Sequence, residues 1–371
     1  MSIFDSWLGV RNRLLASPAF QRWASAFPLT RPIAQKRARE LFDIVAGFVY
    51  SQILFACVRL KLFEILAEGP QSADALAKRM ALPPEGAIRL LRAAVSLRLV
   101  AVCEDKRYTL GELGAAMIGN PGIAAMVEHH AMVYSDLADP VALLRGEVER
   151  TALSNYWSYA ANTDAANVDE QSIDGYTALM SDSQSLIAGD VLDAYSLKDH
   201  KCLLDVGGGD GTFLVTAAKR WPHLKVILFD LPAVAERAKA RFQREGLADR
   251  ATAVGGDVMR DPLPEGADVV SLVRVLHDHD DEEALAIIKA ARRVLPTGGT
   301  LLVAEPMSGT PGAEPIGDAY FGFYLLAMGS GRPRTPVEIE NMLRLNVFDP
   351  VRSVPTVRPI LTRLLAATRM A

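Results

Sequence analysis

The sequence predicts an α/β protein with two domains: a mainly helical domain over residues 1–180 and a domain with a mostly parallel sheet over residues 181–371. The length of 371 residues is sufficient for two hydrophobic cores. The first third of the chain carries mainly helical patterns, whereas from Lys201 onward short apolar runs alternate with helical segments. That alternation is typical of βαβ units, whose strands form a parallel sheet.

The composition favours a globular protein of the cytoplasm. Half of the residues are hydrophobic and 23% are charged. The three cysteines, Cys57, Cys103 and Cys202, lie too far apart for a zinc-site spacing or a disulfide framework. The first residues lack the basic start, apolar core and cleavage site of a signal peptide. The net charge of −4 gives no general attraction to nucleic acid, so we expect no nucleic-acid partner.

The N-terminal segment mixes aromatic and aliphatic residues with arginines. Its apolar members are Trp7, Leu8, Leu14, Leu15, Phe20, Trp23 and Phe27, and its basic members are Arg11, Arg13, Arg22 and Arg31. This mixture resembles an amphipathic segment that lies on a membrane surface. The alternative is a helical arm that packs on its own chain or on a dimer mate.

An uncharged stretch follows at residues 44–58. It contains Tyr50, Ser51 and Gln52 and is too short to span a bilayer, so it predicts a buried helix. A small helical domain has difficulty burying such a stretch by itself. We therefore expect a homodimer built through the N-terminal domain.

Two helices and a hairpin are predicted next. Ser72 is placed to cap a helix that runs through Met80, and Pro84 stands where a second helix begins. Short strand-like runs at 99–102 and 107–110 flank a charged turn. Helix, helix and β-hairpin are the outline of a winged helix.

A winged helix can bind DNA through its second helix. Here that helix offers only Arg89 and Arg92 among many apolar residues. The composition therefore favours a structural or dimerising use of this region over DNA binding.

The second half of the chain carries the strand pattern. Broad helical segments are expected at 126–144 and 156–195. The expected strands are Cys202–Val206, Val226–Phe229, Ala253–Val254, Val269–Val273 and Thr300–Ala304. Asp280 and Asp281 favour the start of a helix between the last two strands, and Pro296 ends it.

A glycine-rich loop follows the first of these strands, in the run CLLDVGGGDGTFL. Strand, glycine turn and helix are the outline of a dinucleotide site, but a pyrophosphate requires bare N–H groups, and a nearby carboxylate opposes its binding. This loop has Asp205 at its entrance and Asp210 inside it. A cationic ligand fits better, and S-adenosylmethionine carries both an ammonium and a sulfonium group.

Two further acids follow at the ends of the next strands. Asp230 ends a strand about twenty residues after the loop, where such folds present a carboxylate to ribose hydroxyls. Its alternative role is a helix cap ahead of Pro232. Asp257 ends the following strand after two glycines and is placed to lie beside the adenine.

Four motifs then resemble one family in their order along the chain. They are Asp205-Val206-Gly207-Gly208-Gly209, Phe229-Asp230-Leu231-Pro232, Gly256-Asp257 and Leu276-His277-Asp278. The chain resembles the S-adenosylmethionine-dependent O-methyltransferases with an N-terminal dimerisation domain, over roughly residues 45–370. The resemblance implies a Rossmann-like domain with a mostly parallel seven-stranded sheet, preceded by a winged-helix-like dimerisation domain, and a homodimer.

The resemblance also assigns roles to single residues. It makes His277 the base that removes the substrate proton and Glu305 the acid that supports this histidine. The cofactor residues that it implies are Asp205, Gly207, Gly209, Asp230, Leu231, Asp257, Val258 and Arg274. The family often has a second glutamate where Pro333 stands here, and that departure casts doubt on a phenol-methylating site.

The remaining histidines are weaker candidates. His279 lies two residues beyond His277, and His129 and His130 are neighbours on an expected helix, so they point in different directions. Thr335 and Glu338 have the spacing of a capping box. We find no cluster of carboxylates on the substrate side that would indicate a metal site.

The branch of the family with the strongest resemblance methylates the 1-hydroxyl of acyclic carotenoids, hydroxyneurosporene and demethylspheroidene, in purple phototrophs. The N-terminal segment and the residues from Asp318 to Phe323 and from Gly329 to Arg334 carry this resemblance. It implies a small hydrophobic hydroxylated substrate, and a protein that is cytoplasmic or peripheral to the inner or photosynthetic membrane. The alternatives are a phenolic or other small aromatic substrate, and a winged-helix regulator with a cofactor-sensing domain. Retention of His277 and Glu305 favours an enzyme, because binding of the cofactor alone requires neither.

Overall fold

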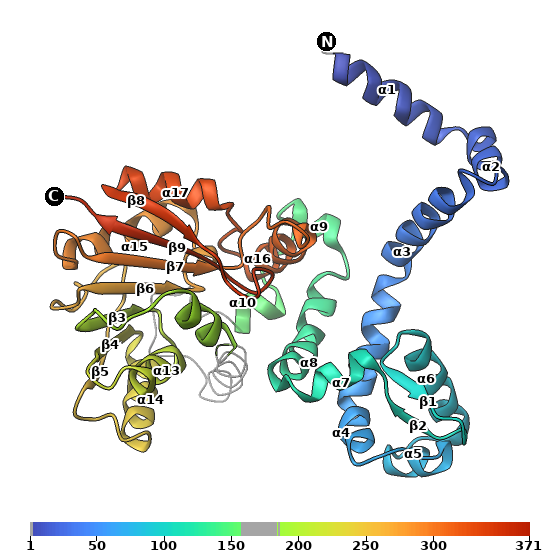
Figure 1. Cartoon of the computed structure of the whole chain (residues 1–371), viewed down its shortest axis with the longest axis horizontal. Coiled ribbons are helices and arrows are strands. Elements are labelled where there is room, and N and C mark those ends of the chain that lie inside the picture. Colours follow the sequence, from blue (N-terminus) through green and yellow to red (C-terminus); the bar gives the residue numbers. More distant parts are fainter. Residues whose placement is uncertain (1–2, 157–183, 185) are drawn as a thin grey trace. The chain divides into compact units, whose positions relative to one another are not determined.

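The computed structural model describes residues 3–156, 184 and 186–371, which form two compact units. The first unit ends at Asn120 and the second begins at Pro121 (Figure 1). The expected helical segment at 126–144 is two helices, α8 (Pro121–Asp136) and α9 (Pro140–Leu144), and α10 (Ala152–Tyr156) follows. Most of the expected segment at 156–195 lies outside the described residues, but residues 186–194 are helical.

This division differs from the expected boundary at 180/181, and hydrophobic packing explains the difference. Val133 of α8, Leu143 of α9 and Leu153 of α10 are buried with residues of α16 (Gly322–Met328) in one apolar cluster. The segment from Pro121 onward therefore belongs with the sheet-containing unit.

The first unit contains the predicted helices and hairpin. In chain order its elements are α1 (Ile3–Ala16), α2 (Pro18–Ala26), α3 (Arg31–Arg59), α4 (Leu62–Ala67), α5 (Ala73–Arg79), α6 (Pro84–Ser96), β1 (Val100–Val102), β2 (Tyr108–Leu110) and α7 (Glu112–Ile118). Ser72 caps α5 as predicted, because its Oγ accepts the N–H of Ala75 at 3.2 Å. β1 and β2 pair antiparallel, so two helices followed by a hairpin are confirmed.

The uncharged stretch at 44–58 is part of the long helix α3. Within the chain Ile44 is 78% exposed and Phe48 is 71% exposed, whereas Cys57 and Val58 near the helix end are buried. Most of this stretch is therefore not buried within the single chain, and its burial at a subunit interface stays a prediction. Among the described residues, α3 is the one helix long and apolar enough to cross a membrane.

The second unit is built on a seven-stranded sheet with the order β5-β4-β3-β6-β7-β9-β8. Its strands are β3 (Cys202–Val206), β4 (Lys225–Asp230), β5 (Ala251–Gly255), β6 (Val269–Val273), β7 (Thr300–Glu305), β8 (Phe348–Val354) and β9 (Arg363–Arg369). The strands from β5 to β7 are parallel, and β9 lies antiparallel between β7 and β8. The seven-stranded, mostly parallel sheet is confirmed, although the apolar pattern had predicted only its first five strands.

Helices cover both faces of this sheet, and each face has its own core. One core joins helix 186–194, α13 (Thr212–Arg220) and α14 (Pro232–Arg244) to the sheet, and the other joins α15 (Asp281–Val294) and α17 (Pro336–Leu345). Because parallel strands run in the same direction, the residues that follow β3, β4, β5, β6 and β7 meet at one edge of the sheet. The predicted site residues stand at these positions.

Candidate active site

The glycine loop begins where β3 ends. Gly207 and Gly209 have left-handed backbone, with φ of 69° and 61°. A Cβ on Gly208 would lie 2.5 Å from Oδ2 of Asp205, so this position has no room for a side chain. The loop therefore brings its bare backbone close to the Asp205 carboxylate.

Asp205 is buried below this loop. Its Oδ1 accepts a hydrogen bond from the Ser271 hydroxyl at 2.5 Å, while its Oδ2 is buried without a partner among the described residues. Burial raises the pKa of Asp205 to about 7; the bond from Ser271 opposes this shift, and the charge of Asp230 adds to it. An unpartnered buried carboxylate oxygen favours a ligand that brings a positive charge or a hydrogen-bond donor.

Asp230 ends β4 and holds the glycine loop. Its Oδ2 accepts the N–H of Gly209 at 2.8 Å, and its Oδ1 accepts the N–H of Leu231 at 2.7 Å. Burial raises the pKa of Asp230 to about 6, and the two backbone bonds partly oppose this shift. Leu231 is the residue that precedes α14, and no side chain caps that helix. The alternative role of Asp230 as a helix cap is therefore not observed.

Asp257 and Val258 lie in the turn after β5. The Asp257 carboxylate accepts the N–H of Met259 at 2.9 Å.

Asp210 has partners of its own, although the charge argument had included it with Asp205. It pairs with Arg241 and accepts a hydrogen bond from the hydroxyl of Thr212 at 2.6 Å. Of the two loop acids, Asp205 is therefore the one whose carboxylate has a buried oxygen without a partner.

His277 and Glu305 form a buried pair, as the family resemblance implied. His277 lies in the short helix η2 (Leu276–Asp278) after β6, and Glu305 ends β7, the neighbouring strand. Oε2 of Glu305 contacts Nδ1 of His277, and Oε1 accepts the N–H groups of Val275 at 3.0 Å and Leu276 at 2.8 Å. This carboxylate orients the ring with Nδ1–H as the donor, which leaves the lone pair on Nε2.

A second acid lies on the other side of the ring. Oδ1 of Asp278 is 3.2 Å from Nε2 of His277. Burial opposes the protonated ring, but the charges of Asp278 and Glu305 and the hydrogen bond to Glu305 outweigh it, so the pKa of His277 is raised. Arg274 lies three residues upstream with a left-handed φ of 58°, and its charge weakly opposes this rise. A raised pKa makes His277 a stronger base.

The segment from Gly329 to Arg334 fixes the turn that carries His277. The Arg334 side chain is buried and donates to the carbonyl oxygens of Leu276 at 2.6 Å and His279 at 2.8 Å. A Cβ on Gly331 would lie 2.2 Å from the carbonyl oxygen of His277, so only glycine fits. Sequence reasoning missed this role of Arg334, because the run Gly331-Arg332-Pro333-Arg334 was considered for the missing glutamate and for the branch of the family.

Three aromatic side chains lie beside this turn, and we call them the aromatic wall: Tyr320, Phe321 and Tyr324. Phe321 stands edge-on to His277, with ring centroids 5.8 Å apart. It ends the π-helix η3 (Ile316–Phe321), which leads into α16; single π-turns inside helices are frequent at functional sites. Tyr320 and Tyr324 are its neighbours, with ring centroids 5.0 Å and 6.5 Å from Phe321.

The weaker histidine candidates have polar partners. Nε2 of His129 lies 2.6 Å from the Tyr324 hydroxyl, and Nε2 of His130 lies 2.7 Å from the Tyr320 hydroxyl. Burial lowers the pKa of His129 to about 4, so its ring is neutral near pH 7. His279 faces Glu283 of α15 at 3.3 Å. His129 and His130 thus contact the tyrosines next to Phe321, whereas His277 pairs with Glu305.

The chemistry of the loop fits S-adenosylmethionine. The buried Asp205 oxygen suits its ammonium group. The open backbone at Gly209 leaves room for the ligand. Asp230 lies at the end of β4, where folds of this kind bind ribose hydroxyls. Over the described ranges, no group of three or more His, Cys, Asp or Glu residues is arranged to hold a metal ion.

Comparison with known proteins identifies the family. Residues 42–120 match the O-methyltransferase dimerisation domain, and residues 134–349 match the O-methyltransferase domain. The demethylspheroidene O-methyltransferase of Cereibacter sphaeroides is 43% identical over 98% of this chain and 95% of its own. The enzyme of the same name from Rhodobacter capsulatus is 38% identical over 96% of this chain and 89% of its own.

A solved structure supports the fold. The crystal structure of human N-acetylserotonin methyltransferase in complex with SAM has a TM-score of 0.74 at 24% identity, and covers 90% of this chain and 98% of its own. The chain is thus an enzyme and not a regulator with a sensing domain. It belongs to the O-methyltransferase family with an N-terminal dimerisation domain, whose methyl donor is S-adenosylmethionine.

Proposed function

We propose that the protein transfers a methyl group from S-adenosylmethionine to the C-1 tertiary hydroxyl of an acyclic carotenoid such as hydroxyneurosporene or demethylspheroidene, in spheroidene-type carotenoid biosynthesis. The observation that carries this proposal is the 43% identity to a demethylspheroidene O-methyltransferase over 98% of the chain. The aromatic wall beside His277 supports it, because aromatic rings suit an apolar polyene.

The proposed cofactor site lies at the carboxyl ends of the parallel strands β3, β4 and β5. Asp205 binds the ammonium group, Asp230 binds the ribose, and Asp257 lies beside the adenine. The remaining members are Gly207, Gly209, Leu231, Val258 and Arg274. When bound, the cofactor supplies an electrophilic methyl group on a sulfonium. The protein holds the acceptor oxygen in line with that methyl group, and such positioning provides much of the acceleration in reactions of this kind.

His277 is the proposed general base. Nε2 takes the proton of the acceptor hydroxyl as the C–O bond forms. Glu305 holds the ring by Nδ1 and, with Asp278 3.2 Å from Nε2, stabilises the imidazolium that results. A tertiary alcohol requires such a base, because it is a far weaker acid than a phenol, whose pKa is about 10.

The position of Pro333 is consistent with an alcohol as the acceptor. The family resemblance implies a second glutamate at this position, and the neighbouring Arg334 binds the backbone of the turn that carries His277. The site therefore relies on Glu305 and Asp278 to support His277.

We further propose that the enzyme is a homodimer that works at the cytoplasmic side of the inner or photosynthetic membrane. The match of residues 42–120 to a dimerisation domain and the exposed apolar face of α3 support the dimer. An acyclic carotenoid partitions into lipid, so the enzyme must collect its substrate at a membrane.

The acceptor is tested directly with the purified protein. We expect labelled methyl groups from S-adenosylmethionine to be incorporated into acyclic 1-hydroxycarotenoids dispersed in detergent, and not into phenols or N-acetylserotonin. His277→Ala provides the background for each acceptor. Methylation of phenols alone would reject the carotenoid proposal.

Binding of S-adenosylmethionine should depend on pH through Asp205. The raised pKa means that its carboxyl group is largely protonated below about pH 7 in the free protein, and a cation binds the ionised form. The dissociation constant should therefore fall by up to about tenfold per pH unit as the pH rises from about 5.5 to 7. The α-amino group of the cofactor stays protonated in this range, because the pKa of such a group is about 7.7. Calorimetry across this range measures the slope.

Asp205→Asn is the matched variant for this prediction. Its amide does not titrate, so we expect a weaker affinity with a reduced slope; Asp230, whose pKa is about 6, accounts for the slope that remains. A wild-type constant that does not change over this range would contradict the assignment of Asp205.

A further inference from the structure

We propose that the N-terminal arm, defined as residues 3–41, binds the surface of an anionic lipid bilayer. This inference rests on the proposed function, since it supplies the contact through which a lipid-soluble substrate is collected.

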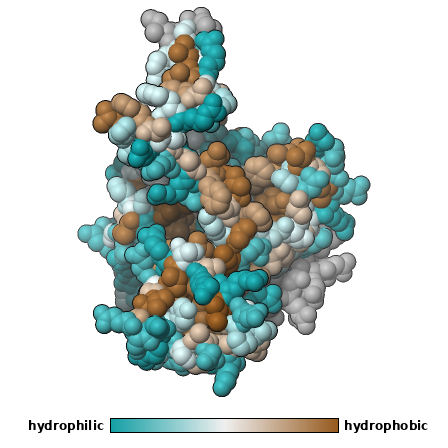
Figure 2. Space-filling model, turned by 90° about the vertical axis from the view of Figure 1, so that its right-hand side faces the viewer, coloured by the Kyte–Doolittle hydropathy of each residue, from teal (hydrophilic) through white to brown (hydrophobic). Residues whose placement is uncertain are grey.

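The arm exposes large apolar side chains along its whole length. Trp7 is 56% exposed and Trp23 is 51% exposed. The other exposed members are Phe4, Val10, Leu14, Phe27, Leu29, Ile33 and Leu41. Figure 2 shows apolar side chains at the surface of this part of the molecule, at the top of the view, next to hydrophilic ones. A water-exposed apolar surface of this length indicates a partner.

The shape of α1 suits a membrane surface. At 100° per residue, Phe4, Trp7 and Leu14 fall on one side of the helix, whereas Asp5 and Asn12 fall on the other. Arg11 lies on the apolar side, and its guanidinium packs 5.2 Å from the centre of the Trp7 ring. A long basic side chain next to a tryptophan is typical of segments at the level of lipid headgroups.

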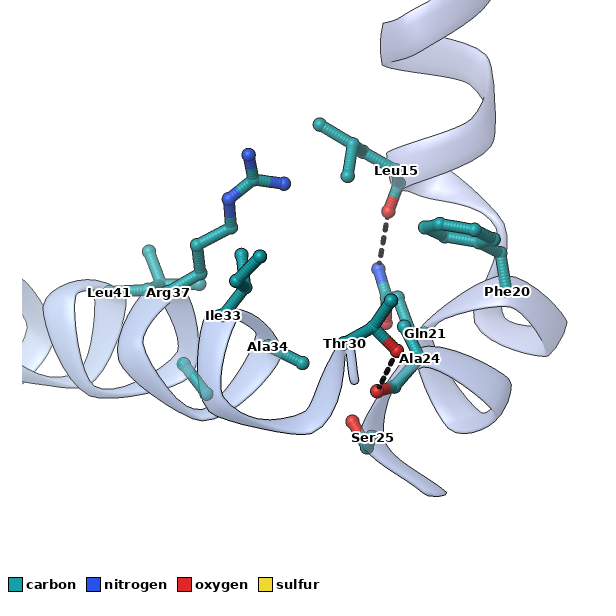
Figure 3. A pocket seen from close by; sticks show the side chains of 11 residues that line it. Leu15, Phe20, Gln21, Ala24, Ser25, Thr30, Ile33, Ala34, Arg37 and Leu41 are labelled. Atoms are coloured by element: carbon teal, nitrogen blue, oxygen red, sulfur yellow. Dashed lines mark hydrogen bonds between the residues drawn. The ribbon is translucent and has the colours of Figure 1, made fainter. Parts of the chain in front are cut away.

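The next helix continues this surface around a recess. Trp23 packs between Phe20 and Phe27, with ring centroids 5.6 Å and 5.2 Å apart. A cavity of about 460 Å³ lies in the corner between α2 and α3, lined mainly by apolar side chains, with Ile33 and Arg37 projecting from α3 (Figure 3). At this corner the Thr30 hydroxyl donates to Ala24 O at 2.7 Å, and the Gln21 side chain joins α2 to α1 by donating to Leu15 O at 2.8 Å. The recess gives a lipid chain an apolar place beside a basic group.

The charge of the arm selects an anionic partner. The arm carries seven basic residues, Arg11, Arg13, Arg22, Arg31, Lys36, Arg37 and Arg39, and two acidic ones, Asp5 and Glu40. Its net charge of +5 contrasts with −4 for the whole chain. Basic clusters of this size next to an apolar helix face bind anionic lipid, and two such arms repel each other.

The family comparison assigns the second copy of the chain to a different surface. The match to the dimerisation domain begins at residue 42, so exposed residues of α3 such as Ile44 and Phe48 fall inside it and the arm falls outside it. We therefore assign the dimer mate to the later part of α3 and lipid to the arm.

Vesicle sedimentation of the full-length protein tests this assignment. We expect binding to vesicles that contain phosphatidylglycerol, little binding to phosphatidylcholine alone, and release at high salt because exposed charges are then screened. The double variant Arg11→Glu/Arg22→Glu should lower the partition coefficient about tenfold or more. Lys198→Glu/Arg352→Glu changes the net charge equally at exposed positions of the second unit and should bind like the wild type. Trp7→Ser/Trp23→Ser removes two rings that are 56% and 51% exposed and should also lower the partition coefficient.

Three outcomes would overturn the proposal. Equal binding of the arm variants and the wild type would exclude the arm, and bound protein that resists high salt and alkali would indicate that α3 crosses the bilayer. A change from dimer to monomer in the arm variants, measured by light scattering, would assign the arm to the second copy. Methylation of carotenoids in detergent is measured in parallel. If it persists while vesicle binding fails, the arm proposal is wrong and the carotenoid proposal stands.

Discussion

The His277→Ala enzyme should turn over about 10²- to 10⁴-fold more slowly than the wild type at saturating concentrations of both substrates. The affinity for S-adenosylmethionine should change little, because the ring lies in η2 after β6, whereas the proposed binding residues Asp205 and Asp230 lie at β3 and β4. Single-turnover methyl transfer separates the chemical step from product release, and calorimetry measures the binding of the cofactor.

The size of this effect follows from the acidity of the acceptor. A tertiary alcohol stays protonated near neutral pH, so its proton must leave during methyl transfer, and the neutral imidazole is the group placed to receive it. Because Asp278 and Glu305 raise the pKa of His277, a larger share of the free enzyme carries a protonated ring that cannot act as a base. The rate should therefore rise with pH until the ring is neutral and then level off, and His277→Ala should lose this rise.

His279→Ala is the control for this prediction. That histidine lies two residues away and faces Glu283 on α15, so its loss should leave turnover nearly unchanged. Equal losses in the two variants, or a near-wild-type rate for His277→Ala, would mean that the base is another group or that positioning alone carries the reaction.

Asp230→Ala should weaken the binding of S-adenosylmethionine by roughly tenfold to more than a hundredfold. A carboxylate bonded to ribose hydroxyls contributes about 1.5–3 kcal/mol, and tenfold in affinity corresponds to about 1.4 kcal/mol. The same carboxylate also orders the loop by accepting the N–H of Gly209, so the variant loses a ligand contact and part of the preformed site. Calorimetry at fixed pH measures the loss.

Two further variants serve as comparisons for this measurement. Asp230→Asn keeps the size of the side chain but has one acceptor oxygen for the N–H groups of Gly209 and Leu231, so it removes the charge together with one of these bonds. Asp249→Ala removes an exposed aspartate near the start of β5 and should bind like the wild type. Wild-type affinity in Asp230→Ala would show that Asp230 only supports the structure.

The sequence predicted the parts of the site that follow strand ends. Asp205, Asp230, His277 and Glu305 each stand at or just after a short apolar run, and a parallel sheet brings the ends of such runs to one edge. The capping box of Thr335 and Glu338 was likewise predictable, because both of its hydrogen bonds join residues within one helical turn. Local patterns and one topological rule therefore account for where these residues meet, whereas the roles of His277 and Glu305 are implied by the family resemblance.

Long-range contacts were not predictable in this way. Arg334 reaches the carbonyl oxygens of Leu276 and His279 from more than fifty residues away, and no spacing in the sequence indicates that bond. The π-helix before Phe321 has no pattern of its own. The exposure of Ile44 in the single chain was not predictable either, since an apolar helix that packs on another molecule has the same sequence pattern as one buried in its own chain.

The placement of β9 between β7 and β8 has a consequence for synthesis of the chain on the ribosome. The free edge of β7 pairs with β9, which is made about sixty residues later. β8 is made before β9, although β9 is the strand that joins it to the sheet. At typical elongation rates of 5–20 residues per second, the nascent chain exposes this edge for about 3–12 seconds. During that interval the unpaired edge of the sheet is open to other chains, so we expect the yield of folded enzyme to depend on the rate of translation through residues 306–369.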